Sequence, residues 1–312
     1  MIVVTGASGY LGSHIVRRLI QEGQGVRAMV HNIERAKKEA RLEGLHIDWV
    51  QANVTEPSSL ERAFEGATVI IHTVAIAIEK GGLDYETINY NGTVNVVEAA
   101  RQRGVKRFIN ISQLGANSDL PYRFLASKGK AQEYVAASDL EWTAFRPAVI
   151  WGPEDEFANT FAKLVPLTPL IFPIVGDEDS RFQPVWVEDV VTCVVKALEA
   201  PHTYRKEFEL GGPEVLTLEE IERRTLKAVD AKRWMLRFPM PVLRLVVSLM
   251  EKLMPAPPVT RSLLELLQVS NVTSDNAIQK FVEEPRPFIV ENIAPYMRQF
   301  TVKETLNQFL GR

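Results

Sequence analysis

The sequence predicts an α/β fold, in which a doubly wound parallel sheet is followed by a smaller, mostly helical C-terminal lobe. Three observations lead to this prediction. A glycine-rich turn joins a strand to a helix at the start of the chain, short apolar segments alternate with helical ones through the first half, and after Pro147 prolines become frequent and the alternation stops. Buried parallel strands have this continuous apolar character, and right-handed crossovers place their helices on both faces.

The first unit of the pattern is a strand, a turn and a helix. Residues 2–4 (Ile-Val-Val) form a short buried strand, and Leu11, Ile15 and Leu19 recur at the spacing of one helix face. Between them stand Gly6, Gly9 and Gly12. A glycine turn between a strand and a helix is typical of a dinucleotide-binding βα unit, whose helix N-terminus faces the pyrophosphate.

Each glycine of this turn has its own expected task. One makes the tight turn, one lets the backbone approach the pyrophosphate, and one lets the helix pack against the strand. The residues expected to contact the cofactor here are Gly6, Ser8, Gly9, Tyr10, Leu11 and Gly12. The alternative is a glycine-rich turn without a ligand.

Further strands and helices alternate up to residue 145. The expected strands cover residues 25–30, 47–50, 68–73, 107–111 and 142–145. The expected helices cover residues 33–42, 57–64, 91–103 and 126–138, and Pro57 suits the first position of its helix. The sequence therefore predicts a cofactor domain over residues 1–150, to which a strand and helix around residues 183–200 return, and a substrate or partner lobe over residues 151–312.

Two segments of the second lobe are unusually apolar. Residues 240–254 form a helix with few charges, and Thr260 is placed to cap a second helix over residues 263–267. The first helix is either a lid over the substrate cleft or a surface for a membrane or a protein partner. All of these alternatives suit a hydrophobic substrate.

Composition narrows the class of protein. The chain has 312 residues, of which 46% are hydrophobic and 24% charged, and its net charge of −3 gives no basic footprint for nucleic acid. The single cysteine, Cys193, cannot form an internal disulfide, and no cluster of residues has metal-ligand spacing. The chain opens on a strand, so we expect no targeting segment and a cytoplasmic protein, with membrane association through residues 240–254 as the variant. The oligomeric state stays open.

The identity of the dinucleotide can be inferred from the second strand. Proteins that prefer NAD place an acidic residue at the end of that strand, where it accepts a hydrogen bond from the ribose 2′-hydroxyl. Here His31 stands at this end, and Arg35 follows. The missing acid and the nearby cations favour NADP(H) over NAD(H), whereas the alternative is a solvated helix face.

Several longer segments resemble the short-chain dehydrogenase/reductase superfamily, in its extended or atypical branch. They are residues 5–12, 89–100, 146–153 and 182–190. Within the superfamily, residues 111–117 and 210–217 are similar to proteins like the nucleotide-binding accessory subunit of respiratory complex I. The resemblance extends to about residue 230. It implies cofactor contacts from Asn53 and Val54, from Val74 and Ala75 beneath the cofactor, and from Pro147 beside the nicotinamide.

The resemblance also shows where this sequence departs from the catalytic pattern of the superfamily. These reductases place a tyrosine four residues before a lysine, but Phe124 stands four residues before Lys128. Tyr122 can donate the proton only if residue 122 precedes the helix; otherwise it is a loop aromatic. Ser112 occupies the place of a substrate-polarising hydroxyl or has a structural role, and Lys128 keeps an expected role on the nicotinamide ribose.

Three functions remain open. The first is an NADP-dependent oxidoreductase on a hydrophobic or small carbonyl substrate. The second is a catalytically weak NADPH-binding sensor or assembly factor of a membrane or respiratory complex. The third is a nucleotide-sugar epimerase or dehydratase.

Overall fold

The computed structural model describes residues 1–175, 179–254, 257, 259–297 and 300–309. The contacts divide the chain into two compact units, each built from three segments. Unit 1 comprises Met1–Pro147, Val187–Leu210 and Asp275–Glu283, and unit 2 comprises Ala148–Trp186, Gly211–Ser274 and Glu284–Arg312.

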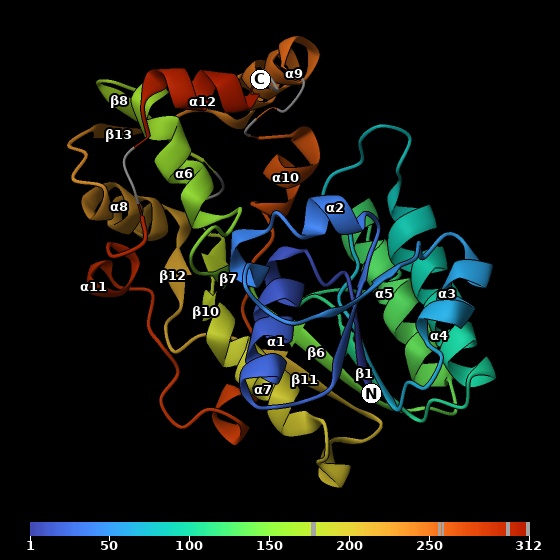
Figure 1. The fold of residues 1–312 in the computed structure, drawn as a ribbon. Coiled ribbons are helices and arrows are strands. Elements are labelled where there is room, and N and C mark those ends of the chain that lie inside the picture. Colours follow the sequence, from blue (N-terminus) through green and yellow to red (C-terminus); the bar gives the residue numbers. More distant parts are fainter. Residues whose placement is uncertain (176–178, 255–256, 258, 298–299, 310–312) are drawn as a thin grey trace. The chain divides into compact units, whose positions relative to one another are not determined.

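Unit 1 is built on a seven-stranded sheet in which every neighbouring pair is parallel (Figure 1). Its strands are β1 (Ile2–Thr5), β2 (Val26–Val30), β3 (Asp48–Gln51), β4 (Val69–His72), β5 (Arg107–Ile111), β6 (Glu141–Pro147) and β11 (Lys206–Leu210). The spatial order β11-β6-β5-β4-β1-β2-β3 reverses direction at β1, which pairs with both β2 and β4. The predicted doubly wound Rossmann sheet is confirmed, with its switch point at β1 and β4.

Helices cover both faces of this sheet. They are α1 (Tyr10–Gln21), α2 (Ile33–Ala36), α3 (Pro57–Ala63), α4 (Gly92–Gln102), α5 (Arg123–Ala137) and α7 (Val187–Ala197). Figure 1 shows α1 and α7 on one face and α3, α4 and α5 on the other. Shorter turns of 3-10 helix cover Ala40–Leu42, Pro201–Thr203 and Ile278–Lys280, and a π-helical turn, Glu86–Asn91, leads into α4.

The core of unit 1 explains why these segments form strands and helices. Ile70 of β4 and Phe108 of β5 are fully buried against Leu60 of α3 and Val96 of α4. Because apolar side chains of the strands meet the apolar stripes of the helices, each element buries surface that it would otherwise expose to water.

Two expectations for unit 1 need correction. The helix expected over residues 33–42 ends at Ala36 and resumes only as the 3-10 turn Ala40–Leu42. The two buried side chains, Ala36 and Leu42, are six residues apart and do not share a helix face. The strand β11 was not predicted, because Lys206, Glu207 and Glu209 give this edge strand a charged character.

Unit 2 is mostly helical, with short pairs of strands. Its helices are α6 (Ala158–Leu164), α8 (Leu218–Ala228), α9 (Met240–Leu253), α10 (Arg261–Leu266), α11 (Val290–Ile293) and α12 (Val302–Phe309), and Val165–Leu167 forms a 3-10 turn. Its strands are β7 (Ile150–Trp151), β8 (Ile171–Ile174), β9 (Arg181–Phe182), β10 (Val185–Trp186), β12 (Leu216–Thr217) and β13 (Trp234–Arg237). They pair as β10 with β7, β12 with β9 and β13 with β8.

The core of unit 2 gathers around Trp151, Phe172 and Phe288. The apolar helix expected over residues 240–254 is confirmed as α9. The capping role of Thr260 is also confirmed, since its side chain accepts a hydrogen bond from the backbone N–H of Leu263 at 3.2 Å.

Candidate functional site

Residues predicted to bind the cofactor, and the predicted catalytic residue Ser112, lie at one edge of the sheet in unit 1. Each follows the carboxyl end of a strand or stands at it. They are Gly6 after β1, His31 after β2, Asn53 after β3, Val74 after β4, Ser112 after β5 and Pro147 at the end of β6. Because all these strands are parallel, their carboxyl ends share one edge, where open α/β sheets bind their ligands.

The glycine turn has no room for side chains at two of its three positions. Gly6 has a φ of +68°, and a Cβ there would lie 2.8 Å from the hydroxyl oxygen of Thr73. A Cβ on Gly12 would lie 2.2 Å from the carbonyl oxygen of Gly6. Gly6 therefore makes the tight turn, and Gly12 lets α1 pack against it.

Gly9 is exposed and stands at the N-cap of α1, and its backbone N–H donates to the carbonyl oxygen of Gly6 at 2.9 Å. A Cβ on Gly9 would lie 3.1 Å from that same oxygen. No side-chain hydrogen bond caps the helix, so its first N–H groups are available to an anion. The glycine turn and the start of α1 therefore fit a pyrophosphate, which needs a backbone without a covering side chain at Gly9.

A cation that sequence reasoning did not single out lies beside the start of α1. The Nε of Arg41 donates to the hydroxyl of Ser13 at 2.7 Å, and its guanidinium lies 5.7 Å from the ring centroid of Tyr10. It also pairs with Glu39 at 2.9 Å. The break in the expected helix over residues 33–42 brings Arg41 to this position, and the sequence pattern did not indicate that break.

The ends of β2 and β3 carry the residues expected to distinguish the adenosine half of the cofactor. His31 and Arg35 are exposed, and Asn32 caps α2 by accepting from the backbone N–H of Arg35 at 2.8 Å. The Oδ1 of Asn53 accepts from the backbone N–H of Thr55 at 3.1 Å. The Nδ2 of Asn53 and the second lone pair of its Oδ1 stay available for a contact with adenine.

At the end of β4, His72 is a buried structural residue. Its Nδ1 lies 2.8 Å from the hydroxyl of Thr5, and its Nε2 lies 3.1 Å from the hydroxyl of Thr93. Burial, together with the charge of Lys128, lowers the pKa of His72 to about 3, so the imidazole is neutral. It ties β1 to α4 just below the glycine turn.

The next residues along this strand end form the edge beside Gly6. The side chain of Val74 would lie 3.1 Å from a Cβ on Gly6, and Ala75 is exposed. Val54, at the other predicted position, is buried against Gly92. An unpredicted residue, Asn89, fixes this edge: its side chain pairs with both the N–H and the C=O of Ile76.

Lys128 and Ser112 are brought together at the end of β5. The Nζ of Lys128 donates to the carbonyl oxygen of Ile111 at 2.8 Å, and Ser112 is the next residue. Burial lowers the pKa of Lys128 to about 8. The Ser112 hydroxyl is buried as well and has no hydrogen-bond partner among the described residues. A buried unpaired hydroxyl is a costly arrangement that a ligand oxygen would satisfy.

The two aromatic residues that precede Lys128, Tyr122 and Phe124, lie at the start of α5. Tyr122 is the N-cap of α5 and has extended backbone angles (φ −85°, ψ 103°), so the helix begins only at Arg123. The helical register therefore does not govern the direction of the Tyr122 side chain. Phe124 lies inside the first turn of α5, with its ring edge-on to that of Tyr85 at 5.7 Å.

In the described part of the chain, no group of three or more histidine, cysteine, aspartate or glutamate residues could hold a metal ion. Besides the side chains of His31, Arg35 and Asn53 at the ends of β2 and β3 and of Arg41 beside α1, this edge carries backbone amides, hydroxyls and Lys128. This set of donors suits phosphates, ribose hydroxyls and a carbonyl oxygen.

Comparisons with known proteins agree with this geometry. A family model described as NAD(P)H-binding matches residues 6–163. The chain is 27% identical over 282 residues to the Arabidopsis thaliana protein named NADH dehydrogenase (ubiquinone) 1 alpha subcomplex subunit 9, mitochondrial. This alignment covers 88% of this chain and 70% of that protein. It is 29% identical over 241 residues to the ceramide reductase of Caulobacter vibrioides, covering 77% of this chain and 74% of that protein.

A solved structure shows the same fold. The UDP-glucose 4-epimerase of Thermotoga maritima matches with a TM-score of 0.71 and 19% identity, over 95% of this chain and 97% of that one. The matched residues 6–163 include the glycine turn, Ser112 and Lys128, and the match supports a nicotinamide dinucleotide as the cofactor of the chain. The chain belongs to the NAD(P)H-binding family, in agreement with its resemblance to atypical members of the short-chain dehydrogenase/reductase superfamily.

Proposed function

We propose that this protein is an NADPH-dependent reductase of a hydrophobic or small carbonyl compound, with a modified group for proton transfer. One observation carries the proposal: at the end of β5, the buried Lys128 is hydrogen-bonded beside Ser112, whose buried hydroxyl has no partner among the described residues. Unpaired polar groups are retained at sites where a ligand completes their hydrogen bonds.

The residues divide the work between binding and proton transfer. When bound, NADPH supplies the hydride that adds to the carbonyl carbon. The Ser112 hydroxyl donates a hydrogen bond to the carbonyl oxygen and stabilises the negative charge that develops there. Lys128 holds the ribose. Its positive charge assists the proton donor in releasing a proton to the carbonyl oxygen of the substrate.

The proton itself must come from a group other than Phe124, which has no ionisable hydrogen. Tyr122 is the candidate, because its extended backbone frees it from the helical register of α5. Proton transfer from a positioned side chain contributes on the order of 10²–10⁴-fold to the rate. If a water molecule or the substrate replaces Tyr122, turnover will be correspondingly slow.

The preference for NADPH rests on the end of β2. No carboxylate stands there to accept from the ribose 2′-hydroxyl, and His31 and Arg35 are both exposed. One charge-assisted hydrogen bond to a 2′-phosphate supports a preference of about tenfold. We infer that Arg35 or His31 makes this contact.

A hydrophobic carbonyl is the favoured class of substrate because the helix α9 of unit 2 is unusually apolar. Relatives reported above include a protein named as a ceramide reductase, which agrees with this class. A second candidate is an NADPH-binding protein with little turnover. The replacement of the usual tyrosine by Phe124 favours it, and so does the relative that is named as a subunit of a larger complex. A nucleotide-sugar epimerase is the least supported, since the likeness to such a structure concerns the fold.

The test is a screen of carbonyl compounds, from short ketones to long-chain 3-ketoacyl lipids, with NADPH oxidation as the readout. We expect turnover with at least one of them. We also expect Lys128→Met to lower kcat/KM by on the order of 10²-fold. Lys130→Met is the matched control, because Lys130 lies two residues further along α5 and pairs with Glu86 at the surface. If NADPH binds but no carbonyl is reduced, the second candidate replaces the first.

A further inference from the structure

Residues 76–85, which we call the β4–α4 loop, lead from the cofactor edge of unit 1 to the start of α5. The loop follows the predicted cofactor contacts at the end of β4. Its first residue, Ile76, is held at its backbone N–H and C=O by the side chain of Asn89. The Nδ2 of Asn89 also donates to the hydroxyl of Ser127 on α5 at 3.2 Å. The beginning of the loop is therefore anchored to α5.

A second anchor lies one helical turn earlier on α5. The carboxylate of Glu79 accepts two hydrogen bonds from the guanidinium of Arg123, at 2.6 and 2.9 Å. The same carboxylate accepts from the backbone N–H of Tyr85 at 3.0 Å, and the Tyr85 hydroxyl donates to the carbonyl oxygen of Ala77 at 2.9 Å. A bidentate pair fixes geometry better than a single surface ion pair does. Glu79 is thus held inside its own loop while it binds Arg123.

Both anchors use one face of α5, and Lys128 lies on another. Arg123 and Ser127 are four residues apart and share a helix face. Lys128 is about 140° from Arg123 around the helix axis, at 100° per residue, and its Nζ reaches the carbonyl oxygen at the end of β5. The loop therefore fixes α5 without occupying the face that carries the buried lysine.

The first turn of α5 gains an anion from this loop. Among the described residues, none caps α5 with its side chain, and the first turn itself holds no acidic residue. Arg123, the first residue of the helix, adds a positive charge at the positive end of the helix dipole, and the Glu79 carboxylate offsets it. Tyr122 is the N-cap, and its carbonyl oxygen accepts from the backbone N–H of Ala126 at 2.9 Å. The position of Tyr122 therefore depends on whether this first turn is formed.

We propose that Glu79 is a positioning residue: through its bidentate pair with Arg123 it fixes the first turn of α5 and so places the Tyr122 phenol for proton transfer. This rests on the proposed function, in which Tyr122 is the candidate proton donor. Phe124 contributes to the same arrangement, because its ring packs edge-on against Tyr85, whose backbone N–H binds Glu79. The residue at the usual tyrosine position thus helps to hold the loop that places Tyr122.

The kinetic test measures the effect of Glu79→Gln in two backgrounds. With a carbonyl substrate, Glu79→Gln should lower kcat about fivefold, a part of what a positioned proton donor supplies, and leave the affinity for NADPH unchanged. In the Tyr122→Phe background it should lower kcat by less than about twofold, because the group through which Glu79 acts has been removed. An unchanged kcat in Glu79→Gln overturns the proposal. So does a fall that is equally large in both backgrounds.

A second measurement needs no turnover. In protein labelled with 3-fluorotyrosine, the fluorine NMR resonance of Tyr122 is assigned by its loss in Tyr122→Phe, and it should shift when NADPH binds the wild type. In Glu79→Gln the resonance should broaden or lose this shift, and amide hydrogen exchange at the start of α5 should become faster. If the wild type reduces no carbonyl but Tyr122 responds in this way, the proposed function fails and the positioning role is kept. A Tyr122 resonance that is the same in wild type and Glu79→Gln overturns the positioning role.

The first matched control lies on the same face of α5. Lys130, seven residues after Arg123, pairs with Glu86 at 3.1 Å, just beyond the loop. Glu86→Gln therefore removes a carboxylate that binds α5 about two turns away from Tyr122. Its kcat and its Tyr122 resonance should match those of the wild type. If Glu86→Gln changes them as much as Glu79→Gln does, the specific role of Glu79 is wrong.

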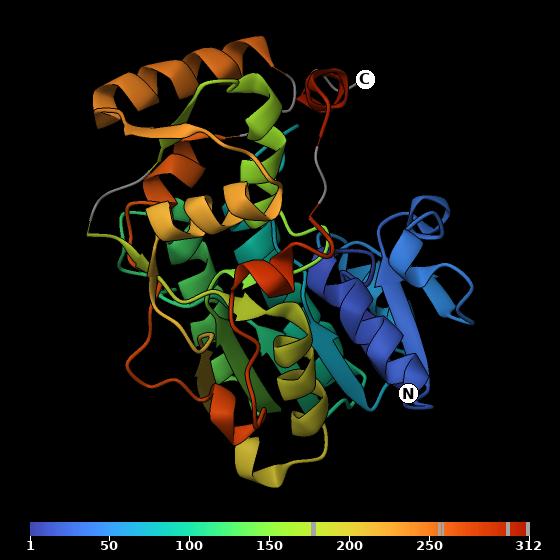
Figure 2. The same ribbon diagram turned by 90° about the vertical axis from the view of Figure 1, so that its left-hand side faces the viewer.

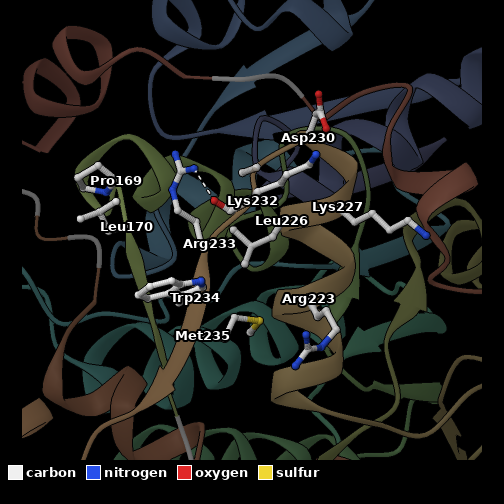
Figure 3. A pocket seen from close by; sticks show the side chains of 11 residues that line it. Pro169, Leu170, Arg223, Leu226, Lys227, Asp230, Lys232, Arg233, Trp234 and Met235 are labelled. Carbon is white, nitrogen blue, oxygen red and sulfur yellow. Dashed lines mark hydrogen bonds between the residues drawn. The ribbon is translucent and has the colours of Figure 1, made fainter.

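The second control is an arginine of unit 2, Arg233, which stands just before β13. Figure 2 shows β13 leading to α9, the upper orange helix. Arg233 lines a pocket of about 730 Å³ (Figure 3), and its Nε donates to the carbonyl oxygen of Thr168 at 2.7 Å. None of the described residues that line this pocket is predicted to bind the cofactor or to transfer a proton.

The two arginine variants complete the experiment. Arg123→Gln should repeat the effects of Glu79→Gln on kcat and on the Tyr122 resonance, whereas Arg233→Gln should change neither. Circular dichroism and NADPH affinity verify that each variant is folded. An Arg123→Gln variant that behaves as Arg233→Gln does overturns the proposal.

Discussion

The Nζ of Lys128 lies 2.8 Å from the carbonyl oxygen of Ile111, and this hydrogen bond fixes the lysine beside the last residue of β5. The bond joins α5 to the edge of the sheet where the glycine turn also lies. Burial lowers the pKa of Lys128 to about 8, because the ammonium is removed from water without a carboxylate partner. A second hydrogen-bonding ligand, such as a ribose hydroxyl, would complete its coordination.

The glycine turn gives the first prediction. Gly9→Val should abolish NADPH binding, since a Cβ at this position lies 3.1 Å from the carbonyl oxygen of Gly6 and a larger side chain covers the backbone that faces the pyrophosphate. Fluorescence titration measures the affinity. Gly25→Ala is the control, because open space surrounds a Cβ there. Equal affinities in wild type and Gly9→Val would rule out the turn as the phosphate site.

Cofactor choice gives the second prediction. NADPH should bind about tenfold more tightly than NADH, which corresponds to one contact of about 1.4 kcal/mol. Arg35→Gln or His31→Gln should remove this difference by weakening NADPH binding alone, whereas Lys38→Gln should not. Calorimetric titration with both cofactors measures it. If the wild type binds NADH as tightly as NADPH, the missing acid at the end of β2 does not indicate which cofactor is preferred.

The third prediction concerns the proton donor. Tyr122→Phe should lower the rate of carbonyl reduction by on the order of 10²-fold while NADPH binding is kept. Phe124→Tyr places a phenol one helical turn before Lys128 and should raise the rate. Steady-state kinetics on both variants measures these effects. A Tyr122→Phe variant as active as wild type assigns the proton to water or to the substrate.

The fourth prediction concerns stability in acid. The pKa of His72 is about 3 in the folded protein, against about 6.5 when the chain unfolds, so the unfolded state binds the extra proton between these values. Stability should therefore fall as the pH drops from 6.5 towards 3, by up to about 1.4 kcal/mol per pH unit from this group. Urea unfolding of His72→Gln, compared with wild type, should show a shallower acid slope.

The exposed His46 supplies the control for that experiment, since His46→Gln removes an imidazole that lies at the surface. Its acid slope should follow that of the wild type. An equally steep slope in His72→Gln would mean that other groups carry the acid sensitivity.

Local features of the fold could be predicted from the sequence, and features that depend on distant contacts could not. The strand, turn and helix around Gly9 are contiguous, so their pattern is complete within the first twenty residues. The roles of Asn89, which binds the backbone of Ile76, and of Arg41, which reaches Ser13, depend on how the chain folds back. The strand β11 was missed because its pairing with β6, across more than fifty residues, outweighs its charged composition.

The candidate site shows the same division. The departure at Phe124 is visible in the sequence, because it concerns a spacing of four residues within one helix. The helix α5 begins at Arg123, three residues before the expected start, and this leaves Tyr122 outside the helical register. Sequence patterns are least informative about the ends of helices. The unpaired hydroxyl of Ser112 appears only when the neighbours of β5 are in place.

The most direct test of the central claim is transfer of deuterium from NADPH labelled at the nicotinamide C4 to a hydrophobic ketone, measured by mass spectrometry of the alcohol. We expect one deuterium on the carbinol carbon with the wild type, and a rate lower by on the order of 10²-fold with Ser112→Ala or Lys128→Met. The account would be contradicted by NADPH binding without transfer to any ketone, or by transfer that neither substitution slows.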